Sequence, residues 1–316
     1  MLKIFQRTLT NLTIAKRMKF IDIGANLTDE VFDGVYSGSK KHDPDRKQVL
    51  ERAWQVGVEK IIITVGTIFD CEPAFKIAAE DERIYCTVGT HPTRCGEFLV
   101  SETDDYFNRL TQQIEDHKDK VVAIGEIGLD YDRLHFCEPD VQKKYFEKQL
   151  ELADKYELPL FLHCRAAHDD LIKIIQDNKK KIRRGGVVHT FDGTLEQAKK
   201  LIALGFHIGI NGCSLKNEAN LEVVKALPND KIMLETDAPW CEIRPTHASF
   251  KHVVTKFETV KKKEKKKWQR DVLIVGRNEP VTIVQVLEVV SAVKGEDPAK
   301  LSEIFYNNTM KVFFPN

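Results

Sequence analysis

Eight short apolar segments recur along this chain, and their spacing leaves few folds open to it. Polar segments with apolar residues at helical spacing separate them, which predicts alternating strands and helices and therefore a parallel sheet. Eight strands within about 220 residues favour a single (β/α)₈ TIM barrel. A doubly wound open sheet is the alternative, but no phosphate-binding GxGxxG follows the first strand. The eight segments are 19–24, 60–66, 84–89, 121–126, 158–164, 186–190, 206–212 and 231–237.

The helical pattern predicts one domain over residues 19–316. Helices are expected at 48–57, 141–156, 167–178 and 195–205, and those at 281–293 and 301–314 are expected to pack against the barrel. Residues 1–18 form an N-terminal extension with four basic residues and no acidic one. This composition is compatible with a mitochondrial transit peptide, and equally with a disordered extension followed by an alternative start at Met18.

Charge and cysteine content exclude several classes of protein. Lys plus Arg equals Asp plus Glu at 48 each, so any affinity for nucleic acid must come from a local patch. The seven cysteines show no CxxC spacing and read as reduced thiols. No apolar run reaches the roughly 18 residues of a membrane span. Six lysines lie within Lys261–Lys267, which is either a solvated surface or a contact to phosphates, with Trp268 available for stacking.

The most informative segment is 121–130, Val-Val-Ala-Ile-Gly-Glu-Ile-Gly-Leu-Asp. Its unbroken apolar start is typical of a parallel strand that is buried on both faces. We expect that strand to end at Glu126, with Gly125 and Gly128 allowing a sharp turn there. A buried carboxylate needs a partner, which can be a metal ion, an Arg or Lys, or a proton.

Polar residues stand at the predicted carboxyl ends of several strands, where barrels of this kind carry their sites. Two histidines and two carboxylates at one rim form a ligand set for a divalent metal, either Mg²⁺, Mn²⁺ or Zn²⁺. Each residue also has a plain structural interpretation. Asp237 could cap a helix, Arg165 could balance the charge of Glu126, and His91 could anchor its loop. The residues are Asn26, His91, Glu126, His163, Arg165, His189 and Asp237.

These motifs resemble those of the TatD family, metal-dependent deoxyribonucleases with an amidohydrolase-like barrel, and in particular its eukaryotic branch. The resemblance runs from residue 19 to the end of the chain and implies Glu126, His163, His189 and Asp237 as metal ligands. It rests on Asp22-x-Gly24-x-Asn26, Gly89-Thr-His91-Pro92, Gly125-Glu126-Ile-Gly-Leu-Asp130, His163-x-Arg165-x-Ala167, His189-x-Phe-x-Gly193, Glu235-Thr-Asp237-Ala-Pro239-Trp240, Gly276-Arg-Asn-Glu-Pro280 and Tyr306-Asn-Asn-Thr309.

One departure from the family pattern concerns the first strand. Many relatives have His-x-His there, whereas this chain has Gly24 and Asn26. A second ion would have to rely on Glu126, Asp237, water and substrate phosphate, which suits Mg²⁺. We therefore expect one firm metal site and one weaker site that is assisted by substrate.

The resemblance implies a DNA substrate and hydrolysis of its phosphodiester bonds, by trimming an end or nicking a strand. In the mechanism we expect, a metal-activated water attacks phosphorus, Asp237 accepts the proton and Glu126 bridges the metal positions. Arg165, His91 and Asn26 are the candidate substrate contacts. The alternatives are a small-molecule amidohydrolase or lactonase with the same metal site, and a barrel that serves only as a scaffold. We expect a location in the nucleus or cytoplasm, with a mitochondrial form through residues 1–18, no membrane association and no obligate protein partner.

Overall fold

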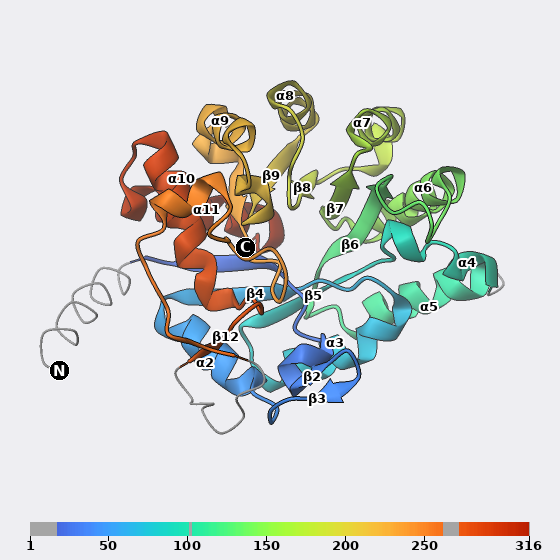
Figure 1. Ribbon diagram of the computed structural model, residues 1–316. Coiled ribbons are helices and arrows are strands. Elements are labelled where there is room, and N and C mark those ends of the chain that lie inside the picture. Colours follow the sequence, from blue (N-terminus) through green and yellow to red (C-terminus); the bar gives the residue numbers. More distant parts are fainter. Residues whose placement is uncertain (1–17, 101–102, 262–271, 316) are drawn as a thin grey trace, which may run out of the picture.

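An eight-stranded parallel sheet, curled into a ring, forms the centre of the computed structural model, which describes residues 18–100, 103–261 and 272–315 (Figure 1). The strands follow one another around the ring in chain order. Beyond the end of the last strand, Ala25 and Ala238 form a parallel bridge that joins it to the first. The predicted (β/α)₈ barrel is therefore confirmed. Its strands are β1 (Phe20–Ala25), β4 (Val58–Ile63), β5 (Ile84–Val88), β6 (Val121–Asp130), β7 (Leu160–Arg165), β8 (Gly186–Val188), β9 (Phe206–Ile210) and β10 (Ile232–Leu234).

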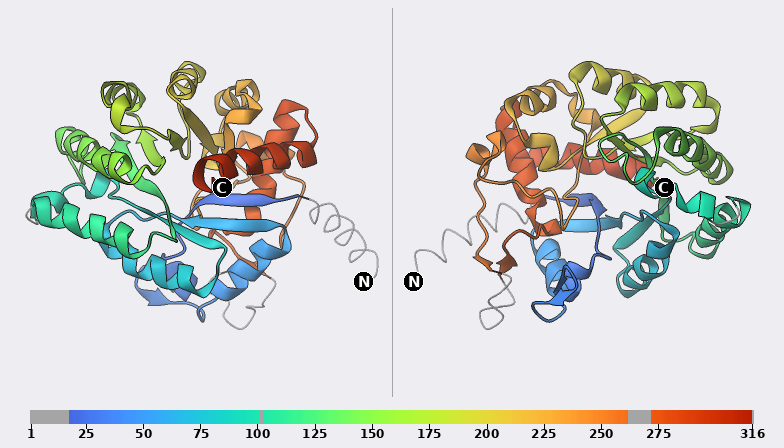
Figure 2. Two further views of the ribbon diagram at one scale, coloured as in Figure 1. Left: turned by 180° about the vertical axis from the view of Figure 1, so that it is seen from behind. Right: turned by 45° about the vertical axis from the view of Figure 1, so that its right-hand side comes forward.

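Helices surround the ring and cover the outer face of the sheet (Figures 1 and 2). None of the helices in the described ranges is long and apolar enough to cross a membrane. The helices are α2 (Arg46–Gln55), α3 (Ile68–Glu80), α4 (Glu97–Val100), α5 (Thr103–Asp116), α6 (Pro139–Tyr156), α7 (His168–Asp177), α8 (Leu195–Ala203), α9 (Glu218–Ala226), α10 (Ile283–Lys294) and α11 (Pro298–Phe313).

Two short ladders lie outside the barrel sheet. One pairs β2 (Val35–Tyr36) with β3 (Ser39–Lys40), and the other pairs β11 (Thr259–Val260) with β12 (Leu273–Ile274). The lysine-rich run begins at Lys261, directly after β11. Its remaining lysines, Trp268 and residues 1–17 lie outside the described residues, so the interpretations of both segments stay predictions.

The hydrophobic core has two parts, one between the sheet and the helices and one inside the barrel. The inner part contains side chains from most strands, including Ile23 and Phe161, and it continues into Phe313 at the end of α11. Next to it, the ring of Phe314 packs edge-on against Tyr85 near the start of β5, with the centroids 4.7 Å apart. The end of α11 thus closes the amino-terminal end of the barrel and leaves the opposite end for a site.

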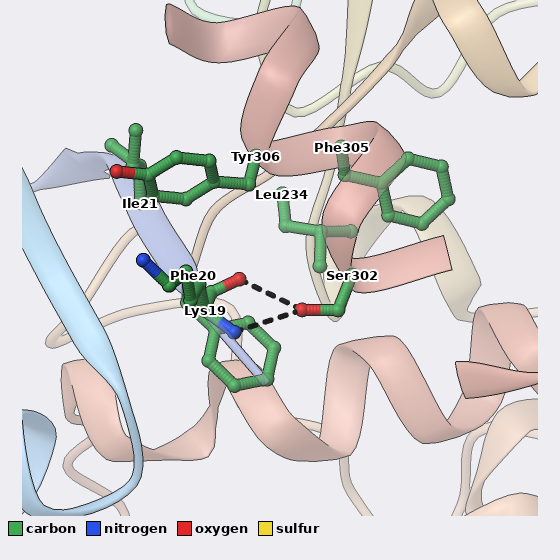
Figure 3. A pocket seen from close by; sticks show the side chains of 7 residues that line it. All are labelled: Lys19, Phe20, Ile21, Leu234, Ser302, Phe305 and Tyr306. Carbon is green, nitrogen blue, oxygen red and sulfur yellow. Dashed lines mark hydrogen bonds between the residues drawn. The ribbon is translucent and has the colours of Figure 1, made fainter. Parts of the chain in front are cut away.

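Helix α11 is also fastened to the start of β1 (Figure 3). The Ser302 hydroxyl accepts a hydrogen bond from the Lys19 N–H at 3.1 Å and donates one to the Lys19 carbonyl at 2.8 Å. A cavity of about 10 Å³ remains between these elements. This is about the volume that one water molecule needs, so the cavity is a packing gap and not a ligand site.

Strand β6 corrects one expectation from the sequence. It does not end at Glu126 but continues to Asp130, and all ten of its residues are buried. Gly125 and Gly128 serve close packing against β7: a Cβ at Gly125 would lie 2.5 Å from the Phe161 carbonyl oxygen, and one at Gly128 would meet the carbonyl of His163. The glycines therefore bring β6 and β7 close together below the candidate site.

This close packing gives a prediction for Gly125→Ala. The added methyl group has no room against Phe161, so we expect the variant to lose about 1–3 kcal/mol of stability, as overpacked core variants do. Gly96→Ala is the matched control, since no atom lies within 4 Å of a Cβ placed there. Thermal and denaturant unfolding of both variants check it. Equal unfolding midpoints for the two would contradict the role given to Gly125.

Candidate metal centre

The Glu126 carboxylate stands at the centre of a group of imidazoles at the carboxyl end of the barrel. Its Oε1 lies 2.8 Å from His163 Nδ1 and 2.8 Å from His189 Nε2. These two nitrogens, from β7 and from the residue after β8, are 3.4 Å apart. Three side chains that the sequence placed on separate strands thus meet at one point.

The spacing of these atoms suits a single metal ion. Two nitrogens that bind one ion tetrahedrally at about 2.0–2.1 Å are roughly 3.3 Å apart, close to the separation between His163 and His189. Glu126, His163 and His189 offer ligand atoms that all lie within 4.8 Å of one another. The residues present therefore fit a divalent cation.

Each of the two histidines is backed by a second carboxylate. His163 Nε2 lies 3.1 Å from Asp130 Oδ2, and Asp130 is fully buried. His189 Nδ1 lies 3.0 Å from Thr190 Oγ1 and 3.4 Å from Glu235 Oε2. A partner of this kind holds the proton on the far nitrogen and leaves the near one free to bind a metal. His163 Nδ1 and His189 Nε2 are accordingly the ligating atoms that the geometry favours.

No role for Asp130 or Glu235 was predicted from the sequence, although both residues lie in the motifs 125–130 and 235–240. A usable signal was present, because side chains two apart on a strand share a face. Asp130 follows Glu126 by four residues within β6, and Glu235 precedes Asp237 by two. Asp130 also groups with His91 and His163 as a set that could hold an ion. We interpret it as the orienting partner of His163, since it contacts the nitrogen that faces away from Glu126.

Buried charge in this group is balanced by protons in the absence of metal. Burial alone would raise the pKa of Glu126, but His189 and His163 outweigh burial and hold that pKa well below its usual value. Burial likewise opposes the charged form of His189, while Glu126 and Glu235 raise its pKa well above the usual range. A cation that binds here replaces the imidazole proton, so binding releases protons.

Asp237 lies beside Glu126, His163 and His189, but it does not belong to the set whose ligand atoms all lie within 4.8 Å of one another. Its Oδ1 accepts a hydrogen bond from Asn26 Nδ2 at 2.9 Å, and its Oδ2 accepts one from the Cys241 thiol at 3.3 Å. Burial raises its pKa to about 6, helped by the charges of Glu235 and Glu126 and opposed by His189. Such a carboxylate is poised to accept a proton near neutral pH.

The end of β1 explains the absence of the histidine pair. A Cβ at Gly24 would lie 2.8 Å from Glu235 Oε2 and 3.1 Å from the Phe161 ring, which leaves no room for an imidazole. The Asn26 amide is occupied at both ends, because its Oδ1 accepts a hydrogen bond from the Thr64 hydroxyl at 2.6 Å while its Nδ2 holds Asp237. Asn26 therefore holds Asp237 in this structure, and its role as a substrate contact stays a prediction.

The other two predicted substrate contacts face the site in different ways. His91 Nδ1 accepts a hydrogen bond from the Thr93 N–H at 3.2 Å, so its Nε2 carries the proton and points toward Glu126, 3.6 Å away. Burial lowers the pKa of His91 to about 3, which keeps the ring neutral. Arg165, at the end of β7, makes no ion pair with Glu126 within the described ranges. The carboxylate is instead balanced by imidazoles.

Comparison with known proteins places this chain in a defined group. The model of the family described as TatD related DNase matches residues 21–314. A curated relative named deoxyribonuclease Tat-D, from Schizosaccharomyces pombe, is 43% identical over 303 residues, which cover 94% of this chain and 96% of the relative. A relative from Erwinia billingiae named 3′-5′ ssDNA/RNA exonuclease TatD is 33% identical over 300 residues, 92% of this chain and 98% of its own.

Solved structures give the same grouping. A hydrolase TatD family protein from Entamoeba histolytica superposes with a TM-score of 0.89 at 37% identity, covering 95% of this chain and 99% of its own. The fold of this chain is thus similar to that of the solved protein over nearly its whole length.

The backing carboxylate gives a prediction for Asp130→Asn. The amide no longer fixes the proton of His163, so the affinity for Mn²⁺ should fall about 10- to 100-fold, as for other lost partners of metal-binding histidines. Asp132→Asn, two residues further and exposed, is the control and should bind as the unmodified protein does. Calorimetric titration of metal-free protein measures both affinities. Unchanged binding by Asp130→Asn would remove the orienting role.

Proposed function

This chain belongs to the family of TatD-related DNases, and from that premise we propose that it is a divalent-metal-dependent deoxyribonuclease that hydrolyses phosphodiester bonds in DNA. The observation that carries the proposal is the meeting of Glu126, His163 and His189, with carboxylates behind both imidazoles. The metal ligands are Glu126, His163 and His189, with Asp237 completing the set. Mg²⁺ is the proposed ion, in one firm site and a weaker one shared with substrate phosphate.

The ion supplies Lewis-acid chemistry, which lowers the pKa of water and withdraws charge from the phosphoryl oxygens. Asp237 is the proposed base. Water oxygen attacks phosphorus, the ester P–O bond breaks, and the water proton passes to the Asp237 carboxylate, which Asn26 and Cys241 hold in place. The leaving oxygen takes up a proton to become the new hydroxyl group.

Two side chains at the rim position the phosphate. The Nε2–H of neutral His91 points into the site and can donate to a phosphoryl oxygen without adding charge. The Arg165 guanidinium can bind a phosphate through two parallel hydrogen bonds. Because the buried centre contains mainly carboxylates, these donors supply the attraction that a negatively charged substrate needs.

The alternative functions have less support. The family match and the names of the relatives, deoxyribonuclease and 3′-5′ ssDNA/RNA exonuclease, favour a nuclease over a small-molecule amidohydrolase or lactonase with the same metal site. A scaffold barrel would tolerate loss of a ligand, and Glu126, His163 and His189 are all in place.

The proposal predicts the behaviour of Asp237→Asn. The amide cannot accept a proton, so hydrolysis of end-labelled single- or double-stranded DNA should fall at least about 100-fold while the fold is kept. Asp116→Asn, at the exposed end of α5, is the control. A chelator should abolish the activity and added Mg²⁺ should restore it. RNA and a nitrophenyl ester assayed in parallel separate the function classes; full DNA hydrolysis by Asp237→Asn would refute the assignment of the base.

We also propose a location in the nucleus or cytoplasm and, from the basic composition of residues 1–18, a mitochondrial form. A fluorescent reporter fused behind residues 1–18 should colocalise in part with mitochondria. Replacing Lys3, Arg7, Lys16 and Arg17 with Gln should remove that fraction. A reporter that stays diffuse with the natural segment would exclude the mitochondrial form.

A further inference from the structure

A hollow of about 770 Å³ opens beside the metal centre, at the carboxyl ends of β7, β8 and β9. Its wall includes Arg165, two residues after His163, and Asp192, three residues after His189. The hollow is therefore continuous with the ends of the strands that carry the metal ligands. Its volume lies within the roughly 300–1,000 Å³ of pockets that hold small ligands. It suits a unit the size of a nucleotide and not a folded partner.

Two cations in the wall have no anionic partner. Neither the Arg165 guanidinium nor the Lys216 ammonium group forms an ion pair within the described residues, and Lys216 is exposed. Nearby Lys251, by contrast, pairs with Glu218 at 2.9 Å. Two unpaired positive charges that face one hollow are an electrostatic footprint for phosphate.

Two helices begin at the same wall. Helix α8 starts after Thr194, and α9 starts after Asn217. Both residues line the hollow, and each forms a capping box at the start of its helix. The N–H groups of a helix's first turn have no partners within the helix, and the helix dipole adds partial positive charge there. An anion between Arg165 and Lys216 would meet the amino ends of both helices.

A buried histidine adds an independent observation. His168 is only 7% exposed and lines the hollow, yet its Nε2 has no hydrogen-bond partner in the part of the chain that the structure describes. The closest carboxylate, Asp192, is 3.8 Å away, beyond hydrogen-bond distance. An unsatisfied polar group of this kind costs about 1–3 kcal/mol, which a ligand or its bound water would relieve.

The lining also indicates which part of a nucleotide is recognised. Among the described residues, His168 is the only aromatic ring in the lining, so those residues offer no platform for the base stacking that many single-strand binders use. Asp132 and Asp192 also line the hollow and can accept hydrogen bonds from amino groups of bases, while they confine the phosphate to the side of the two cations. Recognition mainly through the backbone phosphate follows.

We propose that this hollow binds the nucleotide that flanks the scissile bond, with its backbone phosphate held between Arg165, Lys216 and the amino ends of α8 and α9. The inference rests on the proposed nuclease function. It identifies Lys216, which lies outside the metal centre, as a residue that contributes to the affinity of the protein for a longer DNA strand.

The test uses Lys216→Gln in the full chain, with Lys225→Gln at the far end of α9 as a control of equal charge. The substrates are a single-stranded DNA of about ten nucleotides, within the site sizes of single-strand binders, and bis(4-nitrophenyl) phosphate, which has no flanking phosphate. Lys216→Gln should raise KM for the oligonucleotide about five- to tenfold and leave kcat nearly unchanged. The affinity for the oligonucleotide should also depend less on salt. The slope of log affinity against log salt concentration should become shallower by about 0.7, the value for one lost phosphate contact on a single strand.

The outcomes separate the two proposals. Hydrolysis of bis(4-nitrophenyl) phosphate should be unchanged in both variants, and Lys225→Gln should match the unmodified protein on the oligonucleotide. If the protein cleaves DNA and Lys216→Gln has the normal KM and salt slope, the hollow is not the subsite. If the protein cleaves no DNA, the nuclease proposal fails. Fluorescence polarisation with the labelled oligonucleotide then tests separately whether the hollow binds DNA. Weaker binding by Lys216→Gln supports this subsite, and equal binding overturns it.

Discussion

The contact between Glu126 and the two imidazoles is the interaction around which this molecule is organised. A carboxylate buried at the end of a barrel is unfavourable by several kcal/mol unless something compensates it. Here His163 and His189 both lie 2.8 Å from one oxygen, and Asp130 and Glu235 stand behind them. The result is a centre with more carboxylates than cations. Such a centre remains favourable only while it holds protons or a metal ion, and that requirement connects its electrostatics to its chemistry.

The surrounding fold keeps these groups in register. Close packing at Gly125 and Gly128 brings β6 against β7, which places Glu126 and Asp130 on opposite sides of the His163 ring. Where β1 meets the end of β10, Asn26 links Thr64 to Asp237. Behind that junction, Asn278 donates to the Thr236 carbonyl at 2.9 Å. At the amino-terminal end of the barrel, the end of α11 closes the interior, so packed side chains support the site.

The centre and its rim differ in their charged groups. The centre is acidic and suited to a cation, whereas the adjoining hollow carries Arg165 and Lys216 beside Asp132 and Asp192, together with two helix amino ends. A nucleic acid strand needs both, since the ion acts on one phosphate and the neighbouring phosphates need positive charge of their own. This arrangement explains how a chain with no net charge can act on a polyanion.

Much of this was accessible from the sequence. Unbroken apolar runs such as 121–125, alternating with amphipathic segments, predict parallel strands buried on both faces, and the number of these strands favours a barrel. Since parallel strands end at one rim, the order of the motifs also places Glu126, His163 and His189 together. Periodicity could not show that β6 continues past Glu126, because the glycines there read equally well as a turn.

Only the tertiary structure decided the contacts between residues that are far apart in the chain. The tautomer of His163 depends on Asp130 across the β6–β7 pair, and Asn26 is committed to Asp237 by a hydrogen bond across 211 positions. Whether an amide or a carboxylate is free for substrate depends on which donors already face it, and those donors come from other strands. The sequence by itself determined which chemical groups reach the rim. The packing of the barrel decided which of them contact one another, because hydrogen bonds form between neighbours in space, and these contacts support the roles proposed for them as ion ligands, orienting partners and substrate contacts.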